Sequence, residues 1–105
     1  MELPNTEYID QLSAGNEEFR AKMVSIIKME LPLEIDAYQD KIQTQNYKIA
    51  AECVHKLKHK ISVLGLEKSY YIAEQFEDNL KEGSTNLQIE FEKTLALMQE
   101  FVNCL

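Results

Sequence analysis

The stretch NEEFRAKMVSIIKMELPLEIDAYQDKI, residues 16–42, decides the fold, because apolar residues recur at every third or fourth position along it. This spacing is typical of an amphipathic α-helix, whereas a half-buried strand would alternate apolar and polar residues. Asn16 is a favourable N-cap, and Glu17 and Glu18 follow it where acidic side chains meet the positive end of the helix dipole. The apolar positions that form one stripe are Phe19, Met23, Ile26, Ile27, Leu31, Ile35, Tyr38 and Ile42.

Pro32 lies in the middle of this stripe and has no backbone N–H to donate. The apolar period continues across it, so we expect one long helix with a kink, not two helices. A shorter helical stretch at residues 8–12 precedes this helix.

Three further segments carry the same period. The first runs from Asn46 to Leu64 and the second spans residues 67–81, and they are followed by Gly65 and Gly83, which supply helix stops. The last begins within residues 84–86 and continues toward the C-terminus. The residues expected to face the core are Ala50, Cys53, Val54, Leu57, Ile61, Leu64, Ile72, Ala73, Phe76, Leu80, Leu87, Phe91, Leu95, Met98 and either Phe101 or Val102.

These segments predict an all-α protein. Long amphipathic helices joined by short connections pack as antiparallel neighbours, so we expect an up-down-up-down four-helix bundle with a short N-terminal helix. The 105 residues are enough for one core and contain no repeat or linker, which indicates a single domain over residues 1–105. Because one bundle can bury all its stripes, we expect a monomer.

The formal net charge of −7 argues against binding to nucleic acid or to anionic membranes, both of which depend on basic surfaces. The sequence has no apolar run long enough for a membrane helix, and its first residues do not resemble a signal peptide. We therefore expect a cytoplasmic protein with protein partners. Cys53 and Cys104 form no motif and are expected to be free thiols.

A basic, titratable patch stands out against this acidity in HKLKHKISVLG, residues 55–65. On a helix, His55, Lys58, His59 and Ser62 are three or four positions apart and share one surface. That surface points away from the core stripe, so His55 is not expected to be a core residue. A solvated polar face that happens to hold two histidines is the plainest interpretation.

The same stretch resembles the signature of histidine-containing phosphotransfer (HPt) domains, written H-x-L-K-G-S followed by L-G. His55, Leu57 and Lys58 occupy the first, third and fourth positions, and Leu64-Gly65 follows at the expected distance. The long helix interrupted by proline and the helix after Gly65 also resemble this family, so the likeness covers roughly residues 8–82.

The resemblance implies that His55 accepts a phosphoryl group from the phospho-aspartate of a receiver domain and passes it to another receiver. It also implies that Lys58 stabilises the phosphate and that Gln75, on the following helix, hydrogen-bonds the imidazole or the phosphoryl group. The partners would be receiver domains of response regulators or hybrid sensor kinases, which supply the Mg²⁺. The chain has no Gly-rich nucleotide loop, so we expect a phosphoryl carrier without cofactor or ATP site, and not an enzyme.

One position departs from the family pattern, since His59 stands where glycine is expected. Its side chain either restricts the approach of a receiver or takes part as a second donor to the phosphate. Two alternatives remain open: an adaptor that binds receivers without transferring phosphate, and a zinc site formed by Glu52, His55 and His59. The neighbouring lysines disfavour a cation there.

Overall fold

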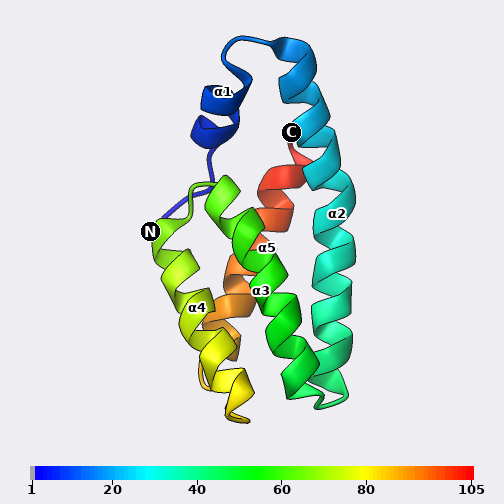
Figure 1. Ribbon diagram of the computed structural model, residues 1–105, viewed down its shortest axis with the longest axis vertical. Coiled ribbons are helices and arrows are strands. Elements are labelled where there is room, and N and C mark those ends of the chain that lie inside the picture. The colour runs from blue at the N-terminus through cyan, green and yellow to red at the C-terminus, as the bar shows by residue number, and fades with distance from the viewer. Residues whose placement is uncertain (1) are drawn as a thin grey trace.

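The computed structural model describes residues 2–105 and contains five helices in that part of the chain (Figure 1). The long helices α2 to α5 pack in sequence as an antiparallel up-down-up-down bundle, and short α1 lies against α2. The predicted all-α bundle is confirmed. Within residues 2–105, no helix combines the length and the apolar character needed to span a membrane. The bounds are α1 Glu7–Ser13, α2 Glu17–Gln43, α3 Tyr47–Val63, α4 Glu67–Lys81 and α5 Gln88–Asn103.

Several helices begin or end at the capping and glycine residues that the sequence predicts. The side chains of Asn16 and Asn46 cap α2 and α3 by accepting hydrogen bonds from backbone N–H groups three residues on, at 3.0 and 3.4 Å. Gly65, just after α3, has a φ of +76°, a left-handed conformation that side chains disfavour. Pro32 lies inside α2, which continues as a single helix on both sides of it.

The start of α5 differs from the expected one. The helix begins at Gln88, and the preceding Leu87 makes no side-chain capping bond. Ser84 does not cap the helix, because its hydroxyl accepts a hydrogen bond from the Asn86 N–H at 3.3 Å within the connecting turn. Local side-chain bonds of this kind favour a turn over the first turn of a helix.

The core runs along the bundle axis, where aromatic rings from three helices meet. Tyr38 of α2 contacts Phe76 of α4 and Phe91 of α5 edge-on, with ring centroids 6.2 and 5.1 Å apart. The Tyr38 hydroxyl donates a 2.9 Å hydrogen bond to Glu92, so this buried polar group has a partner. Among the stripe residues, Leu57, Ile61 and many others are fully buried as predicted, and the core comprises Ile9, Ile27, Leu31, Tyr38, Ala50, Ala51, Val54, Leu57, Ile61, Leu64, Leu66, Ala73, Phe76, Leu80, Phe91, Leu95, Met98 and Val102.

Two residues of the predicted stripe on α2 do not face the core. Phe19 and Ile26 are exposed, and together with Met29 and Leu33 they form a row that we call the outer stripe. Helix α2 is therefore apolar on two sides. Ile26 and Ile27 are adjacent in sequence and differ by 100° around the helix, so periodicity alone could not assign both of them to one face.

An N-terminal clamp, residues 2–5, ties the chain's beginning to the corner between α3 and α4. The Asn5 N–H donates to the Leu64 carbonyl at 2.9 Å. The Glu2 carboxylate accepts hydrogen bonds from the backbone N–H groups of Lys68 and Ser69, at 2.9 and 3.1 Å. Since the residue before α4, Leu66, has no capping side chain, Glu2 satisfies the free donors at that helix start.

Candidate functional site

The polar face predicted on α3 lies on the outside of the bundle. His55, His59 and Ser62 are exposed there, while Leu57 and Ile61 of the same helix point into the core. The His55 side chain is 58% exposed, as the helix phase predicts. Helix α3 packs against both α2 and α4, so the backbone that carries His55 is held in place on two sides.

A carboxylate on the neighbouring helix holds this imidazole. Glu77 of α4 lies opposite His55 because α3 and α4 are antiparallel and joined by a short connection. Its Oε1 is 3.2 Å from His55 Nδ1 and 3.0 Å from Lys58 Nζ, and its Oε2 is 3.3 Å from Lys81 Nζ. One carboxylate, only 10% exposed, thus contacts three basic side chains.

The ionisation of Glu77 decides which imidazole nitrogen carries the proton. Burial acts to raise the pKa of Glu77, but hydrogen bonds from Lys58, His55 and Lys81 outweigh it and hold the pKa below its ordinary value. The carboxylate is therefore ionised at neutral pH and can only accept hydrogen bonds. His55 Nδ1 must donate to it, so in the neutral imidazole the lone pair lies on Nε2.

Lys58 lies deeper than the helix phase suggests. Its side chain is 11% exposed, and its ammonium is 5.6 Å from the centre of the Tyr70 ring. Burial acts to lower the pKa of Lys58, but the hydrogen bond and the charge of Glu77 raise it, so the ammonium stays charged. The sequence predicts this lysine on the surface beside His55, and that prediction is wrong. The side chain lies in the interface between α3 and α4, because long side chains can fold their stems along apolar surface.

His59 and Gln75 are both exposed, but only His59 lies against the imidazole of His55. The two imidazole centroids are 5.8 Å apart and the rings are nearly perpendicular, at 88°. Within residues 2–105, Gln75 has no hydrogen bond to His55, and Glu77 makes that contact instead. A role for Gln75 toward a phosphoryl group stays a prediction.

The two lysines that flank the patch differ in availability. Lys56 is exposed. Lys60 is largely buried, and its Nζ lies 3.0 Å from carboxylate oxygens of both Glu30 and Glu34, so it links α3 to α2. A depression of about 580 Å³ lies next to the imidazole, lined by Ile49, Glu52, Cys53, His55, Lys56, Glu77 and Lys81.

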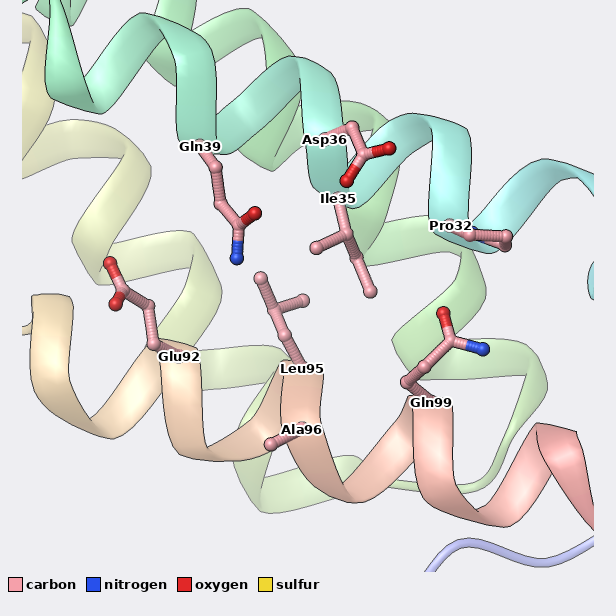
Figure 2. Close-up of a pocket in the computed structure, with 8 residues that line it drawn as sticks. All are labelled: Pro32, Ile35, Asp36, Gln39, Glu92, Leu95, Ala96 and Gln99. Carbon is pink, nitrogen blue, oxygen red and sulfur yellow. The ribbon is translucent and has the colours of Figure 1, made fainter.

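A second hollow lies away from His55. This groove of about 410 Å³ lies between α2 and α5. Figure 2 shows that Ile35 and Leu95 point toward each other across it. Asp36 and Glu92 give it a negative rim, and its lining contains no basic or imidazole side chain. This groove therefore offers no positively charged group to an anionic ligand.

Residues 2–105 contain no cluster of three or more His, Cys, Asp or Glu side chains arranged to hold a metal ion. The alternative of a zinc site at Glu52, His55 and His59 therefore gains no support. Comparisons with protein families, with curated proteins and with solved structures find no match for this chain.

Proposed function

We propose that the protein is a phosphorelay carrier that accepts a phosphoryl group on His55 from the phospho-aspartate of a receiver domain and passes it to a second receiver. The observation that carries the proposal is the contact between His55 Nδ1 and the ionised Glu77. An exposed imidazole with its lone pair fixed on Nε2 is a prepared nucleophile.

In the accepting step, the Nε2 lone pair attacks the phosphorus of the acyl phosphate. The N–P bond forms while the bond from phosphorus to the aspartate oxygen breaks, and the carboxylate leaves. The imidazole keeps its Nδ1 proton and gains positive charge, which the Glu77 carboxylate offsets at a distance of 3.2 Å. Transfer onward reverses these bonds: a carboxylate oxygen of the second receiver attacks phosphorus, and the imidazole leaves as the neutral tautomer.

Two lysines near the imidazole can offset the charge of a transient anionic group. Lys56 is exposed one position from His55, and Lys81 lines the adjacent depression, which Glu52 and Glu77 also line. Lys58 contacts the same Glu77 oxygen as the imidazole, so its charge acts mainly through that carboxylate. We expect receiver domains to supply the divalent metal, since the carrier contributes only the presented histidine and its supports.

The test is phosphoryl transfer from phosphorylated receiver domains encoded by the source organism. Wild-type protein should acquire an acid-labile, base-stable phosphate, and His55→Gln should acquire none while keeping its helical content. His59→Gln removes the neighbouring exposed imidazole but leaves the proposed nucleophile, so this variant should still acquire the phosphate, although more slowly. A receiver that binds wild-type protein without transferring phosphate would instead identify a receiver-binding adaptor.

His59 is proposed to assist transfer, because its ring lies against that of His55 one helical turn away. His59→Ala and His59→Gly should both transfer more slowly, although the glycine variant should also lose about 0.5–1 kcal/mol of stability. If His59 only obstructs the receiver, both variants should transfer faster. Faster transfer by both with every receiver tested would exclude the assisting role.

A further inference from the structure

Two imidazoles lie next to each other on the exposed face of α3. His55 and His59 are the only histidines of the chain and are four positions apart, so they project from the same side of the helix. Their ring centroids are 5.8 Å apart. Two histidines with this spacing on a helix face bind zinc in the H-E-x-x-H motif. The spacing therefore suits two ligands to one metal ion.

The contact with Glu77 prepares His55 as a metal ligand. The Nδ1–H donates to the carboxylate at 3.2 Å, so in the neutral imidazole the lone pair lies on Nε2. A histidine that binds a metal commonly donates its other ring N–H to a carboxylate, which orients the ring and raises its basicity. His59 is exposed and makes no hydrogen bond within residues 2–105, so its ring can turn toward an ion bound at His55.

The lysines that disfavour a cation at the level of sequence are largely neutralised in the structure. Lys58 Nζ lies 3.0 Å from Glu77, and Lys60 Nζ lies 3.0 Å from both Glu30 and Glu34. Within four residues of His55 on α3 and of Glu77 on α4, the exposed charged side chains are Glu52, Lys56, Glu74, Asp78 and Lys81. Carboxylates outnumber ammonium groups among them, so the surface around the two imidazoles is not basic.

We infer that His55 and His59 form a two-histidine site for a divalent transition metal, with Zn²⁺ as the representative ion. Imidazole nitrogens suit Zn²⁺, Cu²⁺ and Ni²⁺, whereas Mg²⁺ prefers oxygen ligands. The described residues contain no group of three or more His, Cys, Asp or Glu side chains arranged for a metal. Water must then complete the coordination shell, so the ion binds reversibly and stays accessible from solvent.

Metal binding and phosphoryl acceptance compete for one nitrogen. Both use the Nε2 lone pair of His55, and a coordinated lone pair cannot attack phosphorus. The competition rests on the proposed function, whereas the metal site does not. Bound Zn²⁺ would keep the carrier from accepting a phosphoryl group, and the Mg²⁺ of a receiver domain would not.

Isothermal titration of the full chain with Zn²⁺ tests the site without any partner protein. One ion should bind per wild-type chain at concentrations up to about 1 mM, and Mg²⁺ should not bind. The two imidazoles act as a chelate, so His55→Gln and His59→Gln should each weaken binding by about tenfold or more. Ser62→Gln is the matched control, because Ser62 is exposed one turn beyond His59, and it should keep the wild-type affinity.

Four results would overturn the site. They are the absence of saturable Zn²⁺ binding to wild type, an unchanged affinity after replacement of either histidine, an equal loss in Ser62→Gln, and wild-type affinity in the variant that lacks both histidines. The last result would assign the ion to thiols or carboxylates, since that variant keeps Cys53 and Cys104. Equal circular dichroism spectra establish that each variant is folded.

Phosphoryl transfer from a receiver that loads the wild type tests the competition. Zn²⁺ at a concentration that saturates the wild type should block its acceptance of phosphate. The same concentration should have little effect on His59→Gln, which keeps the nucleophile but lacks the chelate. Equal inhibition of both proteins would show that Zn²⁺ acts on the receiver and would overturn the competition. If no receiver loads the wild type, the proposed function and the competition both fail, while the titration alone decides the metal site.

Discussion

Replacing Glu77 with glutamine removes the negative charge that holds three basic groups in place. Lys58 is 11% exposed and would remain largely buried without a counter-charge. Breaking a buried ion pair in this way costs about 3–5 kcal/mol, and the amide oxygen that remains can still accept a hydrogen bond that offsets about 1 kcal/mol. We therefore expect the free energy of unfolding to fall by about 2–4 kcal/mol, which corresponds to a drop in Tm of roughly 10–25 °C for a domain of this size.

The same substitution should release the proton of His55 from its fixed position. An amide can accept a hydrogen bond from Nδ1 or donate one to it, so both neutral tautomers become accessible. The charge-assisted bond that supports the positive imidazole during transfer is lost as well. Bonds of that type contribute about 1.5–3 kcal/mol, so transfer to and from His55 should slow by about 10- to 150-fold.

Thermal unfolding followed by circular dichroism measures the first effect, and ¹⁵N chemical shifts of the imidazole at pH 7.5 measure the second without any partner protein. Lys58→Met is the matched control, because it removes the buried cation but keeps the contact between His55 and Glu77. It should preserve the tautomer. A proton on Nε2 of wild-type His55 would refute the role given to Glu77, and so would a free energy of unfolding of Glu77→Gln within about 1 kcal/mol of the wild-type value.

Three further outcomes are expected. Leu57→Ala should lower the free energy of urea unfolding by about 2–5 kcal/mol, since Leu57 is fully buried, and a cost near zero would contradict its place in the core. Gly65→Ala should destabilise by about 1–2 kcal/mol, because its φ is positive and the new Cβ would come within 2.5 to 2.9 Å of Asn5 side-chain atoms; unchanged stability would show that the corner adjusts freely. The pKa of Glu77 is held below its ordinary value of 4.5, so the ionised carboxylate stabilises the fold above that pH, and this stabilisation is lost as the pH falls through the lowered pKa. The free energy of unfolding should therefore fall more steeply below about pH 5 for wild type than for Glu77→Gln. Equal slopes would contradict the link between the ionisation of Glu77 and stability.

Much of the fold could be predicted from the sequence because its signals are local. Asn16 and Asn46 cap helices by bonding to groups three residues away, and Gly65 ends α3 through its own backbone conformation. The faces of α2 were harder to predict. Periodicity reports which residues line up along a helix but not which line meets the core, and α2 has two such lines, one through Ile27 and one through Ile26.

In the site, too, the local features could be predicted from the sequence, and the contacts between helices could not. The exposure of His55 follows from its phase on α3, and the signature in which it stands is contiguous in sequence. Glu77 is 22 residues away on another helix. The one local signal in the sequence is its spacing of four from Lys81, which indicates an ion pair along α4. Its contacts with His55 and Lys58 depend on how α3 and α4 pack. The burial of Lys58 has the same cause, since a charged side chain gives no local sign of the interface that will cover it.

The N-terminal clamp has a consequence for the order in which the molecule folds. Helices α2 to α5 pack mainly against their neighbours in sequence, an arrangement of low contact order that favours rapid folding. The two bonds from Glu2 to the start of α4 instead join residues 66 and 67 positions apart, so they require a far larger loop to close. We expect the clamp to form after the bundle and to open before it. Native-state amide exchange should then detect a separate unit in which the Lys68 and Ser69 amides exchange through local opening, while amides in the middle of α3 exchange only through global unfolding.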